Sequence, residues 1–247
     1  MDLLVVNDLV KIYPGNVEAL RGISFKVEPG EVYGLIGPNG AGKTTTLRII
    51  ATILEPTHGE VYVDGYSVVD QPDEVRRRIS YLPEEAGAYK YLTGLEFLEF
   101  IAKIYTDDPR LRSEMIRDAL AISGLGERIK DKIRTYSKGM LRRLLVAKTL
   151  MVKPKLALLD EPTAGLDVLN AQRIRYIIKE YAKKHGIAVL LSSHNMLEVE
   201  YLCDRIGILY RGKLIVEGSP KKLIEEYKVV NLEELFTKLI GEQYESF

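Results

Sequence analysis

The spacing of apolar and polar residues changes along the chain and predicts three kinds of structure. Between residues 20 and 28 apolar side chains alternate with polar ones, and Pro29-Gly30 ends the run. A short segment at 61–63, flanked by Gly59 and Gly65, has the same character. A period of two is typical of half-buried antiparallel strands. We therefore expect a small antiparallel β subdomain in the N-terminal part of the chain.

Between residues 93 and 123 the spacing becomes that of helices. Thr93 is followed three residues later by Glu96, which is a capping-box pattern. Two apolar stripes with helical spacing follow, at 97, 98, 101, 104 and 105 and, after Pro109, at 115, 116, 119 and 120. We expect this part of the chain, at about residues 88–150, to be an α-helical subdomain inserted into the rest of the fold.

Short apolar runs at 32–36, 156–160 and 187–191 are of the buried-strand type, and helix-type segments follow the first two. Alternation of such strands with helices predicts a mostly parallel sheet that binds ligands at its carboxyl edge. Two more apolar runs, at 206–210 and 214–216, indicate a hairpin. The predicted fold class is α/β, with a mostly parallel core sheet and the two subdomains described above.

Composition narrows the function classes. The chain has 247 residues, and its 35 Lys and Arg balance 35 Asp and Glu, so charge gives no general attraction to nucleic acid. Basic runs such as Arg142-Arg143 are expected on solvated helix faces. The single cysteine, Cys203, excludes a disulfide framework or zinc cluster and is expected to be a small buried residue. The N-terminus lacks a signal-peptide pattern, and no apolar run approaches the roughly 20 residues that span a bilayer.

Residues 37–44 match the pattern of a phosphate-binding loop; their sequence is Gly37-Pro38-Asn39-Gly40-Ala41-Gly42-Lys43-Thr44. The glycines allow backbone N–H groups to face an anion, and the helix that follows directs its N-terminal dipole at it. Lys43 would hold the β- and γ-phosphates, and Thr44 would offer its hydroxyl to Mg²⁺. A strand-type run precedes the loop and a helix-type run follows it. The core is therefore predicted to be of the P-loop ATPase type and to bind a nucleoside triphosphate.

A second chemical motif follows the apolar run at 156–160. Asp160 ends that run and Glu161 comes next. A carboxylate at the carboxyl end of a buried strand beside the loop can hold Mg²⁺ through water, and the adjacent Glu161 can orient or deprotonate an attacking water. The pair predicts hydrolysis of the bound nucleotide.

These motifs, in this order, resemble the ATP-binding cassette of ABC transporters over nearly the whole chain. Residues 136–140, Tyr136-Ser137-Lys138-Gly139-Met140, lie where that family has its signature, usually Leu-Ser-Gly-Gly-Gln. Residues 164–167, which end in Asp167, look like its D-loop. His194 looks like its switch histidine, and Tyr13 is placed like the aromatic residue that stacks on adenine.

The resemblance implies ATP and Mg²⁺ as ligands and a head-to-tail dimer that closes around two ATP molecules. One subunit would supply Tyr13, the loop 37–44, Thr45 and the metal-binding Thr44 and Asp160. Lys43, Glu161 and His194 would be its catalytic residues. The signature and D-loop of the partner would add Ser137, Lys138, Gly139 and Asp167. Closure would drive a separate transmembrane permease, and hydrolysis would reopen the dimer.

Two residues depart from the family pattern. Glu84 stands where a Gln is usual, and we expect it to bind Mg²⁺ more tightly without abolishing turnover. Lys138 replaces a signature glycine. Two placements are open for it: near the γ-phosphate of the partner's ATP, or in solvent.

The signature and the segment around Glu84 resemble cassettes of drug or sodium exporters, so export is expected. The protein would lie in the cytoplasm, on the inner face of the cell membrane, as a homodimer. The alternatives are a soluble cassette ATPase that acts on ribosomes or nucleic acid, and a regulatory module that binds ATP without hydrolysis. Residues 1–230 are expected to form the ATPase domain and 231–247 a C-terminal helical tail. Its apolar face would pack on its own subunit, or on a second subunit or the permease.

Overall fold

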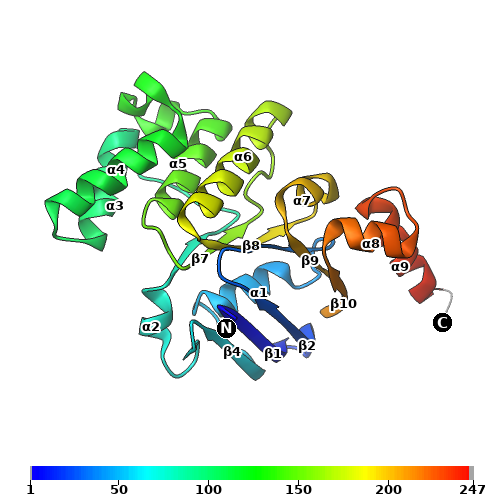
Figure 1. Cartoon of the computed structure of the whole chain (residues 1–247). Helices are drawn as coiled ribbons and strands as arrows, with labels where there is room; N and C mark the ends of the chain where they lie inside the picture. The colour runs from blue at the N-terminus through cyan, green and yellow to red at the C-terminus, as the bar shows by residue number, and fades with distance from the viewer. Residues whose placement is uncertain (1, 245–247) are drawn as a thin grey trace.

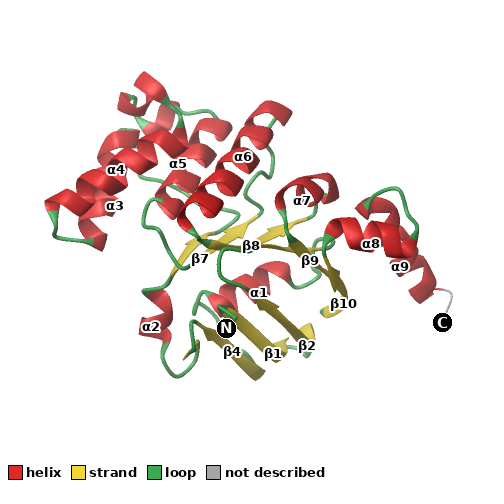
Figure 2. Cartoon of the chain, in the orientation of Figure 1, coloured by secondary structure: helices red, strands yellow, loops and turns green. Residues whose placement is uncertain are grey.

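A computed structural model of the chain describes residues 2–244. Helices cover one face of a central sheet, and a second sheet lies on the other side of it with helix α1 between the two (Figures 1 and 2). The strands are β1 (Leu4–Tyr13), β2 (Val17–Val27), β3 (Val32–Ile36), β4 (His58–Val63), β5 (Tyr66–Ser67), β6 (Ile79–Leu82), β7 (Leu156–Asp160), β8 (Ala188–Ser193), β9 (Arg205–Tyr210) and β10 (Lys213–Gly218). The α-helices are α1 (Lys43–Ile50), α2 (Pro72–Arg76), α3 (Gly94–Tyr105), α4 (Pro109–Ser123), α5 (Lys138–Leu150), α6 (Val168–His185), α7 (Met196–Leu202), α8 (Pro220–Tyr227) and α9 (Leu232–Tyr244).

The N-terminal sheet has the strand order β2-β1-β4-β5 and is antiparallel. Burial alternates along the second half of β2, where Ile23, Phe25 and Val27 face the interior. The predicted antiparallel subdomain is confirmed.

The larger sheet has the order β10-β9-β3-β8-β7-β6. Neighbouring strands from β9 to β6 run parallel, and β10 pairs antiparallel with β9 as the predicted hairpin. The mostly parallel core is therefore confirmed. Because β3, β6, β7 and β8 run in the same direction, the loops after them lie at one edge of the sheet. The register places Asp160 beside Ser192 and Ile36 beside Ser193 at that edge.

Two apolar clusters lie on opposite faces of this sheet. One, which includes Leu158, fills the space towards α1 and the antiparallel sheet. The other, which includes the next residue, Leu159, lies under the helices and extends into α3, α4 and α5. Successive side chains of a strand point to opposite faces of the sheet. Because both faces are covered, Leu158 and Leu159 are both fully buried, each in a different cluster. The helical subdomain shares its core with the main sheet, and its limits at 88–150 stay a prediction.

The capping pattern in the sequence marks the start of α3 correctly, whereas the apolar stripe of this helix is only partly buried. Thr93 and Glu96 form the predicted capping box at α3. Within the first stripe Phe97 is buried, but Ile104 is 64% and Tyr105 53% exposed. The stripe is therefore buried at its start and exposed in its last turn. Helical spacing sets the direction of a side chain, and it does not determine whether another element covers it.

The C-terminal helix α9 packs on its own chain, against α7 and α8. Leu232 and Leu235 are fully buried in the cluster under the helices. The start of the helix is held by Glu200 of α7, whose Oε1 accepts a hydrogen bond from the amide of Leu232 at 2.6 Å. This packing supports the first interpretation of the tail, in which its apolar face packs on its own subunit.

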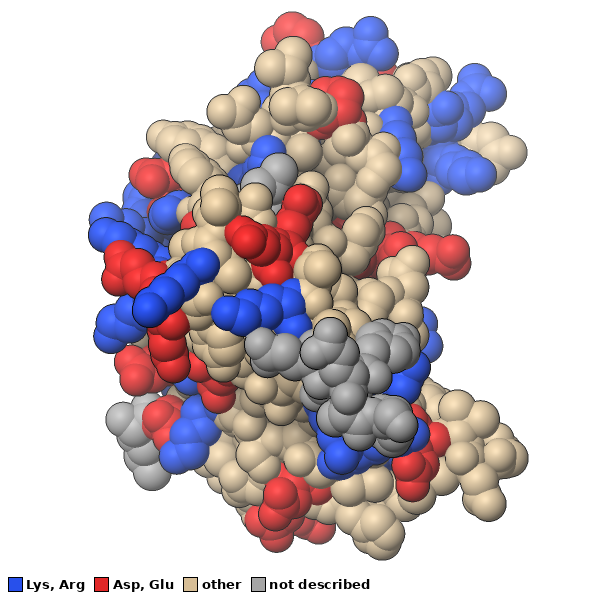
Figure 3. Space-filling view, turned by 90° about the vertical axis from the view of Figure 1, so that its right-hand side faces the viewer, with Lys and Arg blue, Asp and Glu red and all other residues tan. Residues whose placement is uncertain are grey.

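Basic and acidic side chains are intermixed over this side of the molecule (Figure 3).

Within residues 2–244, no helix combines the length and the apolar composition needed to cross a bilayer.

Candidate functional site

The loop 37–44 requires glycine at two positions because other backbone segments pass close to it. Gly42, directly before α1, has φ 111°, and a β-carbon there would lie 2.7 Å from the carbonyl oxygen of Ala19. Gly37 has φ 154°, and a β-carbon there would overlap the carbonyl oxygen of Leu209. Only glycine adopts such conformations at low cost in so little space.

Lys43 lies inside this loop with 6% of its surface exposed. Its Nζ donates to the carbonyl oxygens of Gly37 at 2.7 Å and Pro38 at 3.2 Å. The ammonium is also 3.7 Å from Oε1 of Glu161. Burial lowers the pKa of Lys43, and the carboxylates of Glu161 and Asp160 oppose that shift. A cation held in this way at a curled loop suits the binding of phosphate groups.

Asp160 lies at the end of β7 and is 1% exposed. Its Oδ1 accepts hydrogen bonds from Oγ of Ser192 at 2.5 Å and Oγ1 of Thr44 at 3.2 Å. Its Oδ2 accepts one from the hydroxyl of Tyr81 at 3.4 Å. Burial, together with the Asp160 charge, raises the pKa of Tyr81 to about 12. The two residues predicted to bind metal at the strand end and the loop are thus direct neighbours.

Glu161 is 6% exposed and has a left-handed backbone, with φ 48°. Such a conformation costs a non-glycine residue about 1–3 kcal/mol and is found at functional sites. Its amide donates to Oγ of Ser192 at 3.0 Å, and its carbonyl oxygen accepts from Nη2 of Arg142 at 2.7 Å. Oε1 lies 2.9 Å from Nδ1 of His194. Lys43, Glu161 and His194, far apart in sequence, therefore meet at one carboxylate.

These groups open into a cleft of about 400 Å³ at the carboxyl edge of the sheet. Its lining consists of Tyr13, Val17, Glu18, Ala19, Asn39, Gly40, Gly42, Lys43, Thr44, Thr45, Glu84 and Glu161. The hydroxyl of Tyr13 is 3.3 Å from Oγ1 of Thr45, which ties β1 to the first turn of α1. Ala41 is buried next to the cleft. Val17, Glu18 and Ala19 were not predicted, because nothing in their sequence marks the start of β2 as a ligand-facing segment.

A second cleft, of about 520 Å³, shares Glu161 with the first and has His194 in its wall. It also contains the D-loop residues Ala164, Gly165 and Leu166. His194 therefore faces a space on the D-loop side of Glu161.

The donor set fits magnesium. In the part of the chain that the structure describes, no group of three or more His, Cys, Asp or Glu side chains is arranged to hold a metal ion. Mg²⁺ usually takes only one or two carboxylates from a protein and completes its shell with phosphates and water. Thr44 and Asp160 beside the phosphate-binding loop, with Glu84 in the same cleft, match that requirement.

The signature residues lie apart from the first cleft and take no part in its lining. Ser137 is exposed and caps α5, because its Oγ accepts a hydrogen bond from the amide of Met140 at 3.2 Å. Gly139 faces Asn170 of α6 so closely that a β-carbon would meet it at 2.9 Å. Asp167 caps α6 by accepting a hydrogen bond from the amide of Asn170 at 3.0 Å. Hydrogen bonds from the backbone and the side chain of Asn170 lower the pKa of Asp167.

Lys138 is exposed, as one of its two open placements requires, but it also contacts its own chain. Its ammonium lies against Gly165 of the D-loop, in the space that a β-carbon at position 165 would fill. The signature and the D-loop therefore touch within one subunit.

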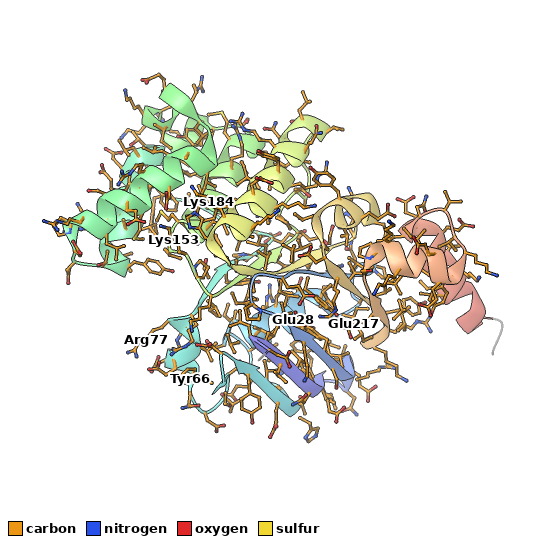
Figure 4. All side chains as sticks on the ribbon, in the orientation of Figure 1. Glu28, Tyr66, Arg77, Lys153, Lys184 and Glu217 are labelled. Atoms are coloured by element: carbon orange, nitrogen blue, oxygen red, sulfur yellow. The ribbon has the colours of Figure 1, made fainter. Side chains whose placement is uncertain are left out.

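Arg142 is the residue that sequence reasoning misjudged. In other runs of basic residues, Arg77 and Lys184 are exposed as expected (Figure 4). Arg142 is only 7% exposed, and its guanidinium binds backbone carbonyls. The expectation of a solvated face was wrong because α5 is covered by other elements. A signal was present, since residue 142 falls on the same helical face as the buried Gly139 and Val146.

A phosphate-binding loop, a strand-end Asp-Glu pair and a histidine at the next strand, set on a mostly parallel sheet, define a P-loop ATPase. Residues 20–164 match the ABC transporter family. This chain belongs to that family and is an ATP-binding, ATP-hydrolysing subunit.

Two relatives carry names that refer to resistance. The linearmycin resistance ATP-binding protein LnrL of Bacillus subtilis (strain 168) is 38% identical over 221 residues, which are 90% of this chain and 70% of that protein. The daunorubicin/doxorubicin resistance ATP-binding protein DrrA of Streptomyces peucetius is 39% identical over 215 residues, 87% of this chain and 64% of that protein. The chain thus spans about two thirds of the length of these relatives.

Solved structures of the same class are similar over most of the chain. An ATP-binding subunit of an ABC transporter has a TM-score of 0.84 and 32% identity, and the match covers 96% of this chain and 99% of that one. An ATP-binding cassette solved as a dimer, in a post-hydrolysis state with ADP and Pi, has a TM-score of 0.79 and 27% identity. That match covers 87% of this chain and 98% of the other.

Proposed function

We propose that this chain powers export through a separate membrane permease, by closing with a second copy of itself around ATP. The observation that carries the proposal is the separation of the ATP-related residues into two places. Lys43, Thr44 and Glu161 line the first cleft, whereas Ser137 caps an exposed helix end outside it. A second copy would bring that helix end to the cleft, and a related cassette was solved as a dimer.

Within one subunit, each side chain has a distinct task in hydrolysis. Lys43 neutralises charge on the β- and γ-phosphates of ATP. Thr44, Asp160 and Glu84 hold Mg²⁺, which supplies further charge neutralisation when it is bound. Glu161 orients the attacking water and accepts its proton, and His194 keeps that carboxylate in place through Nδ1.

The partner subunit completes the site with the N-terminus of α5. The N–H groups of a helix start attract anions, and Ser137 and Gly139 leave this start open to a phosphate. Asp167 holds the adjoining start of α6. In this arrangement ATP closes the dimer because both subunits bind it, and hydrolysis removes that bridge.

The permease would dock on the helical subdomain. An apolar groove of about 540 Å³ lies there, lined by Tyr89, Lys90, Tyr91, Leu92 and Phe100. Tyr91 is 81% exposed, and Phe100 is 41% exposed. The groove begins five residues after Glu84, so movement at the cleft reaches it through a short segment. An apolar cytoplasmic segment of the permease fits this groove, and the chain would then lie on the inner face of the cell membrane.

Export is favoured by the two relatives named for antibiotic resistance. Neither the relatives nor the structures described above support the alternative of an ATPase that acts on ribosomes or nucleic acid.

Light scattering of Glu161→Gln protein with and without Mg-ATP tests the closure. Removal of the base should trap the ATP-bound state, so we expect an ATP-dependent shift from monomer to dimer that is weak or absent in wild type. ADP should not produce it. Ser137→Glu in the same background should abolish the dimer, because a carboxylate would then face the phosphates. Glu161→Gln protein that binds ATP and stays monomeric would contradict closure of the isolated chain.

A further inference from the structure

We propose that Arg142 is a positioning residue for ATP hydrolysis. It fastens the segments after β6 and β7 to helix α5, and so keeps Glu84 and Glu161 at their places in the first cleft. This inference rests on the proposed function only for the roles of those two carboxylates.

The guanidinium of Arg142 lies where two loops meet. Its Nη1 donates to the carbonyl oxygens of Pro83 and Glu84, both at 3.1 Å. On the other loop, Nη2 donates to the carbonyl oxygens of Asp160 and Glu161, both at 2.7 Å, and Nε to that of Pro162 at 2.9 Å. Arginine has five N–H donors in a fixed planar fork, which suits five acceptors that lie around one point.

The convergence of these carbonyls is a local departure from strand geometry. In an extended strand successive carbonyls point in opposite directions, yet those of Asp160, Glu161 and Pro162 all reach the guanidinium. The left-handed backbone of Glu161 makes this possible. Arg142 therefore stabilises the conformation that directs the Glu161 side chain towards Lys43 and His194.

Arg142 also connects this conformation to the signature. It lies on the same helix as Ser137, which caps α5. If a nucleotide on the partner subunit moves the start of α5, Arg142 moves with the helix. Its hydrogen bonds would then shift Glu84 and Glu161 in the cleft of the same subunit.

The next residue offers a matched control. Arg143 also donates to backbone carbonyls, those of Ser123 and Gly124 at the end of α4, at 3.3 and 3.2 Å. Its contacts are of the same chemical kind and on the same helix, but they hold two helices together and do not reach the cleft.

The test compares Arg142→Lys with Arg143→Lys in the full chain. Lysine keeps the charge and the aliphatic stem but lacks the fork, so it cannot serve both loops. For Arg142→Lys we expect kcat to fall about 10- to 100-fold, the effect of a small misplacement of a catalytic group. KM and ATP affinity should change less than about threefold, because the phosphate-binding loop is untouched. Arg143→Lys should leave kcat unchanged.

A spectroscopic readout makes the test independent of turnover. The chain has three histidines, His58, His185 and His194, so their ring resonances can be resolved by NMR. Arg142→Lys should move the resonances of His194, which contacts Glu161, and leave those of His58 and His185 in place. Arg143→Lys should leave His194 unmoved.

Several results would overturn the proposal. One is a folded Arg142→Lys protein with wild-type kcat and unmoved His194 resonances. Another is an equal loss of kcat in Arg143→Lys, or a loss of ATP affinity as large as the loss of kcat. If Arg142→Lys does not fold, Arg142→Gln takes its place, and failure of both to fold would show a purely structural role. A Glu161→Gln protein that does not dimerise would instead count against the transport proposal alone.

Discussion

Ser192 joins the two carboxylate-bearing residues at the end of β7, and its hydroxyl can be removed with little change in shape. Its Oγ donates to Oδ1 of Asp160 at 2.5 Å and accepts from the amide of Glu161 at 3.0 Å. Ser192 is fully buried and Asp160 is 1% exposed, so water does not replace the lost donor. The remaining donors to Asp160, from Thr44 and Tyr81, are longer, at 3.2 and 3.4 Å.

The size of the effect follows from the charge of the acceptor. A hydrogen bond to a charged group contributes about 1.5–3 kcal/mol, against about 1 kcal/mol for a neutral pair. The amide of Glu161 keeps the carbonyl oxygen of Ser192 as a partner at 3.3 Å. We therefore expect Ser192→Ala to lower the free energy of unfolding by about 2 kcal/mol. Turnover should fall as well, because Asp160 and Glu161 both lose a contact that orients them.

Urea unfolding followed by circular dichroism measures the free energy of unfolding, and the rate of phosphate release from ATP measures turnover. Ser80→Ala is the matched control. Ser80 is also buried in a strand, but its Oγ donates to the neutral carbonyl oxygen of Thr149, at 2.7 Å. That variant should lose about 1 kcal/mol and keep its turnover. The reasoning is refuted if Ser192→Ala costs no more stability than Ser80→Ala does.

Three further predictions concern the metal site, the helical subdomain and the tail. Glu84→Gln should raise the Mg²⁺ concentration needed for half-maximal ATP hydrolysis and leave turnover at saturating Mg²⁺ unchanged, because an amide carries no charge. An inactive wild type that this change restores would contradict it. Thr93→Ala should lower the free energy of unfolding by about 1 kcal/mol by removing a helix cap. The amide of Thr93 donates to Glu96 and holds its pKa below 4.5, so the stability from Glu96 is present above that pH and is lost as the pH falls through its lowered pKa. Alanine keeps that amide, so the deficit of Thr93→Ala in urea unfolding should persist on acidification, whereas the deficit of Glu96→Ala should shrink. A Glu96→Ala deficit independent of pH would speak against the capping box. Leu235→Ala should cost about 2–5 kcal/mol because this side chain is fully buried, whereas Val230→Ala, at 83% exposure, should change stability by less than about 0.5 kcal/mol in thermal unfolding. Unchanged stability with weaker dimerisation in Leu235→Ala would instead assign the tail to another subunit.

The sequence alone determined the features that depend on neighbours along the chain. The helix cap at Thr93 follows from a polar side chain and the amide three residues ahead, so local sequence predicts it. The phosphate-binding loop and the Asp160-Glu161 pair were found in the same way, because the strand, turn and helix that shape each one are contiguous. The alternation of strands and helices along the sequence was sufficient to predict the fold class.

Only the tertiary structure decided which distant residues meet and which side chains are covered. It brought Ser192 to Asp160 through the parallel register of two strands, and it placed Arg142 against the carbonyls of two loops that are far from it in sequence. It also left Ile104 in solvent although its spacing matches a buried stripe. The physical reason is the same in each case. Burial and long-range hydrogen bonds depend on the elements that pack against a residue, and a single chain's local pattern does not contain that information.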